Sequence, residues 1–192
     1  MPKVVNHADR RTEIANAAAR IMASRGLGNT TVRDIAREAG FTSGILAHYF
    51  RDKDEVLSHA LQLLDDRSAE RFGPALSSSD PIQAVFEDGM PLDPDREVDS
   101  RARIQFWARA LSSDDLASQQ ATSFKSWIAA TRALLRARQA RGELGEDLKI
   151  EPVSEVLVAL VVGAGVLAVF LPKRSRRAFV RRIVDTATNA LF

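Results

Sequence analysis

Apolar residues recur at helical spacing along nearly the whole chain, and no stretch alternates apolar and polar positions long enough to predict a strand. The first apolar stripe runs through 8–24. A second helix of about eight residues is predicted after Thr31, which forms a capping box with Asp34. A third short helix is predicted over 43–50. The pattern therefore predicts an all-α protein of about nine helices.

The second and third helices flank the turn Gly40-Phe41-Thr42, where glycine allows the chain to turn with a positive φ. Two short helices in this order, with one before and one after, are typical of a helix-turn-helix that places its second helix in the major groove of DNA. A helical hairpin inside a core would give the same bare pattern, so both interpretations stay open on periodicity alone.

The rest of the chain is predicted to form further helices separated by loops. The fourth helix begins at Asp52, where Glu55 completes an Asp-x-x-Glu cap, and is predicted to end near Gly73-Pro74. Loops are expected at 76–80 and 90–95. The remaining helices are predicted over about 81–89, 96–111, 114–141, 151–171 and 175–191.

Charge supports a nucleic-acid contact at the N-terminal end only weakly. The chain of 192 residues has a net charge of +2, but residues 1–53 hold nine basic and five acidic side chains, which leaves −2 for the remainder. The absence of cysteine excludes disulfides and thiolate metal sites. The first residues lack the apolar core of a signal peptide, so a cytoplasmic location is expected.

The gapless stretch from Thr30 to Lys53 strongly resembles the TetR family of transcriptional repressors, and the resemblance extends over 11–64. Three short pieces look like the branch of the choline and betaine-pathway repressors: Phe106-Trp107, Gly142-Glu143-Leu144 and Leu171-Pro172. The resemblance implies a helix-turn-helix DNA-binding domain over 1–53 and an effector-binding and dimerisation domain over 54–192.

The same resemblance implies a DNA-binding site. Thr31, Arg33, Tyr49 and Lys53 are expected to hold phosphates, and Lys3, Arg10 and Arg11 are expected before the first helix, within reach of phosphate or the minor groove. The residues expected to face the groove are Thr42, Ser43, Gly44, Ala47 and His48. Ala47 offers only a methyl group where the family often has an aromatic ring. His48 fits either a base or a phosphate.

The stretch 156–171 contains no charge, but its sixteen residues fall short of the twenty or so that a membrane helix needs. A helix buried on all sides is therefore preferred to a membrane span. As in the family, one face is expected to pair with a second copy in a four-helix interface. The expected interface residues are Val158, Val162, Gly165, Val169, Phe179, Ile183 and Ala187.

The middle helices of the family enclose an effector cavity. Side chains expected to line it here are Phe86, Arg103, Phe106, Trp107, Phe124 and Trp127. For each single aromatic residue, ordinary core packing is the favoured interpretation, whereas the family architecture implies that some pocket exists. The tryptophan faces suit a cation and the arginines suit an anion, so the charge of the effector stays open.

These features predict a homodimeric repressor that binds a palindromic operator and leaves it when a small-molecule effector changes the spacing of the two recognition helices. A constitutive DNA-binding protein without effector is the main alternative. An enzyme is not expected, because the chain has no cysteine, only three histidines and no metal or triad spacing. No cofactor is expected.

Overall fold

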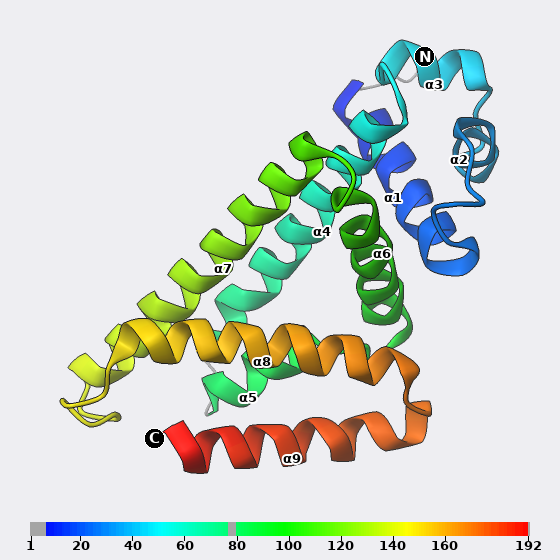
Figure 1. Cartoon of the computed structure of the whole chain (residues 1–192). Coiled ribbons are helices and arrows are strands. Elements are labelled where there is room, and N and C mark those ends of the chain that lie inside the picture. Colours follow the sequence, from blue (N-terminus) through cyan, green and yellow to red (C-terminus); the bar gives the residue numbers. More distant parts are fainter. Residues whose placement is uncertain (1–6, 77–79, 192) are drawn as a thin grey trace, which may run out of the picture. The chain divides into compact units, whose positions relative to one another are not determined.

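The computed structural model describes residues 7–76 and 80–191, and this part of the chain contains nine α-helices and no strand (Figure 1). The predicted all-α class is confirmed. The helices are α1 (His7–Arg25), α2 (Val32–Glu38), α3 (Ser43–Tyr49), α4 (Lys53–Leu76), α5 (Pro81–Asp88), α6 (Pro94–Ala110), α7 (Asp114–Ala140), α8 (Ile150–Phe170) and α9 (Lys173–Leu191).

The first helix is predicted over 8–24 and is found as α1, but the placement of Arg10 and Arg11 before it was wrong, because both lie within its first turns. The predicted end of the fourth helix was also too early. Helix α4 continues past Gly73-Pro74 to Leu76. Pro74 stands in the last turn, where the missing N–H removes a single backbone hydrogen bond and so does not stop the helix earlier.

The chain forms two compact units. Unit 1 extends to Arg67 and includes Val98–Gln119, whereas unit 2 comprises Ser68–Glu97 and the chain from Gln120 onward. Helices α4, α6 and α7 therefore each begin in one unit and end in the other. Packing thus groups part of α6 with the N-terminal helices, although the expected functional division falls at residue 53.

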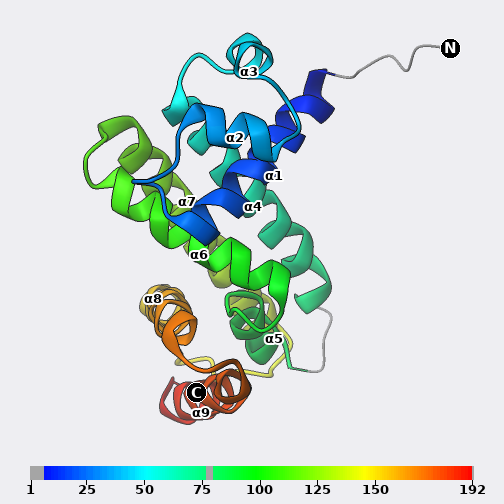
Figure 2. The ribbon, with the colours of Figure 1, turned by 90° about the vertical axis from the view of Figure 1, so that its right-hand side faces the viewer.

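Unit 1 contains two neighbouring groups of buried side chains. Ile14, Ile35 and Leu46 join α1, α2 and α3 in the first group. In the second, Met22 of α1 and Phe106 of α6 pack with apolar residues of α4. Burying side chains of this size contributes about 2 kcal/mol each. In both ribbon views α3 lies at the outer end of these helices (Figures 1 and 2).

Unit 2 is built from α5, the later part of α7, α8 and α9, and Phe86, Leu135 and Val180 lie in its core. A Cβ atom on Gly165 of α8 would lie 2.9 Å from the carbonyl oxygen of Gly89, so only glycine permits this approach. Unit 2 also buries the guanidinium of Arg176 at the start of α9.

Candidate nucleic-acid interface

Short-range hydrogen bonds set the direction of α3. Thr31 forms the predicted capping box with Asp34, which begins α2. Gly40 has a φ of 76°, and the following Phe41 N–H donates to the Ala36 carbonyl over 2.8 Å. Thr42 then caps α3, because its hydroxyl oxygen accepts from the amide of the third helical residue over 3.3 Å. The turn is thereby fixed within twelve residues.

The far end of α3 is fixed by Arg11 of α1. Its guanidinium lies 4.2 Å from the centre of the buried Phe50 ring and donates to the Tyr49 carbonyl over 2.5 Å. It also donates to Glu55 over 3.1 Å. The phosphate contact predicted for Arg11 is untested, but in this structure its guanidinium holds α3 against α1 and α4.

The predicted base-facing residues lie together on the outer side of α3. Thr42, Gly44, Ala47 and His48 are exposed, and Ser43 is half-buried. The His48 ring centre lies 5.3 Å from that of the half-buried Tyr49, and His7 of α1 lies 4.5 Å from the same tyrosine ring. The surface of α3 thus carries small and polar residues at its start and aromatic rings at its end.

Thr31 and Lys53, which are also predicted to bind phosphate, already have partners within the chain. The Thr31 hydroxyl donates to Asp34 over 2.5 Å, and the Lys53 ammonium donates to the carbonyls of Leu27 (3.0 Å) and Thr30 (2.6 Å). Burial of the ammonium lowers the pKa of Lys53. Arg33 is exposed on α2. Lys3 lies outside the described residues.

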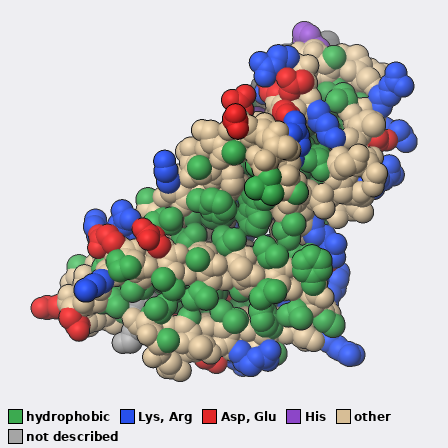
Figure 3. Space-filling model, viewed as in Figure 1, with side chains coloured by type: hydrophobic (Ala, Val, Ile, Leu, Met, Phe, Trp, Pro, Cys, Tyr) green, Lys and Arg blue, Asp and Glu red, His purple; other side chains and the backbone are tan. Residues whose placement is uncertain are grey.

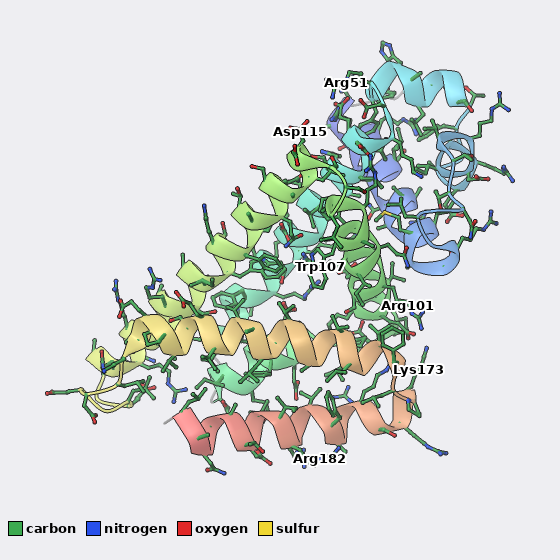
Figure 4. All side chains as sticks on the ribbon, viewed as in Figure 1. Arg51, Arg101, Trp107, Asp115, Lys173 and Arg182 are labelled. Carbon is green, nitrogen blue, oxygen red and sulfur yellow. The ribbon has the colours of Figure 1, made fainter. Side chains whose placement is uncertain are left out.

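The cap predicted at the start of α4 is present in altered form. The Asp52 carboxylate accepts from the Glu55 amide over 2.8 Å, but the Glu55 carboxylate accepts from the Arg51 amide and not from that of Asp52. These backbone hydrogen bonds are the main reason why the pKa values of both carboxylates are lowered. Arg51 lies near Asp115 at the start of α7 (Figure 4). Acidic residues thus offset the charge of Arg51.

A surface hollow of about 580 Å³ opens beside α3. The sequence prediction did not assign Ile45 and Phe41 to the site, although both line the hollow. The spacing of four residues between Ile45 and Tyr49 could have indicated that they share a side of the helix. The full lining is Arg10, Phe41, Thr42, Gly44, Ile45, His48 and Tyr49.

The residues predicted for the effector site fall into both units. In unit 1, Phe106 is buried, Trp107 packs on the same cluster, and Arg103 donates to Asp65 and to the Leu64 carbonyl. In unit 2, Phe86 is buried in the core, and Phe124 and Trp127 form an edge-to-face pair with centres 5.3 Å apart.

A further residue of α7 was absent from the prediction. Gln120 is only 5% exposed, and neither its amide oxygen nor its amide nitrogen has a hydrogen-bond partner in the described part of the chain. A buried amide without partners costs about 1–3 kcal/mol. No sequence pattern indicates its burial, because a glutamine in a long helix is usually exposed.

The predicted dimer residues occupy different positions. Gly165, Val169 and Ala187 are buried within the chain and cannot offer much surface to a partner. Val158, Val162, Phe179 and Ile183 are half-buried.

Large apolar side chains of α8 are instead exposed at three other positions, Val156 (43%), Leu167 (58%) and Phe170 (77%). Figure 3 shows hydrophobic side chains spread over α8. Helix α8 is long and apolar enough to cross a membrane, but Leu157 and Ala168 lie in the core of unit 2. The apolar surface of α8 therefore has one side turned into its own unit and one side exposed.

No group of three or more metal-binding side chains occurs within 7–76 and 80–191.

Comparison with known families identifies both parts of the chain. Residues 79–192 match the C-terminal region of BetI-type transcriptional repressors, and residues 14–60 match the tetR family of bacterial regulatory proteins. The HTH-type transcriptional regulator PksA of Bacillus subtilis is 27% identical over 96% of this chain and 90% of its own length. BetI of Cronobacter sakazakii is 28% identical over 73% of this chain and 75% of its own.

Solved structures share the fold. A transcriptional regulator from Rhodococcus superposes with a TM-score of 0.83 at 23% identity, covering 94% of this chain and 95% of its own. A transcriptional regulator from Saccharomonospora viridis, solved in complex with choline, superposes with a TM-score of 0.78 at 20% identity, covering 95% of each chain.

Proposed function

Because the chain belongs to the TetR family of transcriptional regulators and carries a BetI-type repressor C-terminal region, we propose that it is a homodimer that represses transcription from a palindromic operator and is released by a small molecule. The observation that carries the proposal is the exposed outer side of α3, with Thr42, Gly44 and His48 on a helix fixed from both ends. This geometry suits insertion into a major groove.

Dimerisation is supported by the exposed stripe of α8. Val156, Leu167 and Phe170 are separated by eleven and three residues, which brings them to one side of the helix, and the exposed Ala159 and Gly163 lie between them. Small residues in the middle of an apolar stripe allow a second helix to approach closely. An uncharged face of this kind is stabilised by a second copy of the same face.

The dimer is tested by introducing a charge into this stripe. Leu167→Glu should convert the dimer to a monomer in light scattering at micromolar concentration and weaken operator binding at least tenfold. Leu111→Glu is the matched control, because Leu111 is 91% exposed in the turn after α6. A wild-type monomer, or a Leu167→Glu dimer, would contradict this part of the proposal.

Effector binding is supported by the unpartnered Gln120 amide and by the paired rings of Phe124 and Trp127 on α7. Aromatic faces bind quaternary ammonium groups, and a structural relative holds choline, so choline is the first probe. Release of operator DNA by choline would support a choline-type effector. Release by another metabolite would keep the proposed response and change its ligand.

The operator is defined by selecting bound duplexes from a random pool and footprinting the selected sequence. An inverted repeat, protected in full by the protein and lost when cell extract is added, is the expected result. An inverted repeat that no extract or metabolite affects would favour a constitutive DNA-binding protein. Absence of any preference over bulk DNA at moderate salt would refute the proposal. A cytoplasmic location follows from action on chromosomal DNA and belongs to the same proposal.

A further inference from the structure

Ile45 is a large aliphatic side chain on the outer side of α3, and 42% of its surface is exposed. Its neighbours on the buried side, Leu46 and Phe50, are only 1% and 2% exposed. The core of unit 1 therefore does not account for an isoleucine at this position. A branched apolar residue on the exposed side of this helix is available to a partner of apolar chemistry.

The hollow next to Ile45 indicates what kind of partner fits there. Its walls include the Phe41 ring, the Tyr49 ring and the Ile45 side chain, which present mainly carbon. The Arg10 guanidinium lies 4.8 Å from the centre of the Phe41 ring and also donates to Glu13 over 2.7 Å. The Thr42 hydroxyl oxygen accepts from the Ile45 amide. The hollow thus combines an apolar wall with a cation at one margin.

Only one base presents an apolar group in the major groove. Adenine, guanine and cytosine show hydrogen-bond donors and acceptors there, whereas thymine adds its 5-methyl group. A cation beside the apolar wall suits the phosphate that flanks such a base. Resting on the function proposed above, the geometry points to a thymine-reading site: we propose that Ile45, with Phe41 and Tyr49, receives the 5-methyl group of one thymine in each operator half-site.

The opposite flank of α3 provides the contrast. Ala47 also has a methyl group and is exposed, but it does not line the hollow. Positions 45 and 49 lie on one flank of the helix and positions 43 and 47 on the other. The site therefore assigns methyl recognition to Ile45 and leaves Ala47 with a smaller part in sequence preference.

The test removes the methyl group from the DNA without changing hydrogen bonding. Each thymine of the selected operator, with its symmetry mate, is replaced by deoxyuridine, and the dissociation constant of the full-length dimer is measured by fluorescence anisotropy. One buried methyl group corresponds to about a fourfold change in affinity, so a symmetric pair should weaken binding about 15-fold. We expect one thymine position to show this loss.

Protein variants connect that loss to Ile45. The quantity compared is the dissociation constant for the deoxyuridine operator divided by that for the thymine operator. In Ile45→Ala this ratio should fall to about 1, and in Ile45→Val it should take an intermediate value. The matched variant Ala47→Ser should keep the ratio of the wild-type protein. Circular dichroism and thermal melting check that each variant folds. If Ile45→Ala does not fold, the result for Ile45→Val decides the test.

Three results would overturn the inference: no thymine position sensitive to deoxyuridine, an unchanged ratio in both Ile45 variants, or loss of the ratio in Ala47→Ser. Each requires a wild-type protein that binds its selected operator. Absence of any selected operator would instead refute the proposed function, so the two failures are distinguishable.

Discussion

The start of α3 in unit 1 and the start of α9 in unit 2 are fixed by different kinds of interaction. Helix α3 is directed by a turn whose hydrogen bonds join residues a few positions apart, from the Thr31 cap to the Thr42 cap. Helix α9 is anchored by Arg176, whose side chain is 5% exposed and donates to the Pro91 carbonyl over 2.8 Å, 85 residues away. The first device follows from local sequence, whereas the second exists only in the folded chain.

The anchor of α9 includes a carboxylate. The carboxylate of Glu97, at the start of α6, lies 3.3 Å from the Arg176 guanidinium and 2.9 Å from the Lys173 ammonium. Lys173 is labelled in Figure 4. Hydrogen bonding to Lys173, followed by that to Arg176, lowers the pKa of Glu97 from 4.5 to about 2. We therefore expect the stability of unit 2 to depend on this ion pair, whereas the turn before α3 is held by backbone and cap hydrogen bonds.

The largest effect is expected for Arg176→Met. The substitution removes the donor to the carbonyls of Leu171, Pro91 and Val169 and leaves Glu97 with one partner fewer. Breaking a buried ion pair costs about 3–5 kcal/mol. Urea unfolding should record this loss in the free energy of unfolding. Arg177→Met, on the exposed side of α9, should change it by less than about 0.5 kcal/mol. Equal losses in the two variants would remove the basis of the comparison.

The second prediction concerns acid. Because the pKa of Glu97 is lower in the folded chain than in the unfolded chain, its contribution of about 3 kcal/mol is present at neutral pH and lost as pH falls from about 4.5 to about 2. Unfolding of the wild-type protein and of Glu97→Gln is measured across this range. The stability difference should be largest near pH 7 and shrink toward pH 2. A difference independent of pH would mean that the carboxylate charge is not involved.

Unit 1 also contains cations that bond distant segments of the chain, such as Arg11, and Lys53 is another of them. Its ammonium bonds two carbonyls more than twenty residues earlier in the chain. Hydrogen bonds from charged donors contribute about 2 kcal/mol, so Lys53→Met should lower the free energy of unfolding by about that amount.

The same variant separates two roles for Lys53. A purely structural role predicts that DNA affinity recovers once the protein is stabilised by cooling. A phosphate contact predicts a lower affinity for all sequences. It also predicts that the slope of log K against log salt concentration becomes shallower by about 1 per protomer, which corresponds to the loss of one phosphate contact. Lys125→Met on α7, an exposed position, is the control for loss of one positive charge.

The smallest effect is expected for Thr42→Ala. Loss of the cap should destabilise the folded state by about 1 kcal/mol, because the first turn of α3 keeps its backbone contacts to Leu46. Thermal melting measures this change, with Thr188→Ala on the exposed side of α9 as the matched control. A loss as large as that of Arg176→Met would show that the turn is not held locally.

The contrast also explains how much the sequence predicted. The capping box of Thr31 and Asp34 and the turn at Gly40 were predictable because each involves residues three to five apart. The contacts of Arg176 with Pro91 and of Lys53 with Leu27 and Thr30 were not, since nothing in the sequence relates a cation to carbonyls 23 to 85 residues away. These contacts depend on how distant segments pack.

Helix α8 is an intermediate case. Its uniform apolar sequence predicted burial on all sides but could not show which side faces the chain itself. The structure resolves this at Gly165, which approaches Gly89 within unit 2, while Leu167 is exposed. In the same way, the exposure of Ile45 depends on where Leu46 and Phe50 are buried. A helical wheel shows only which side of α3 carries Ile45 and not whether that side is covered.

The passage of three helices through both units limits how the regulator can be recombined. A hybrid that joins residues 1–53 to another regulator would carry Leu27, whose amide donates to Gln105 over 3.0 Å, but not the glutamine that accepts it. It would also separate Met22 from Phe106. An exchange of operator specificity between relatives is therefore expected to succeed when residues 98–119 travel with the first helices, so that the inherited segment is discontinuous in the gene.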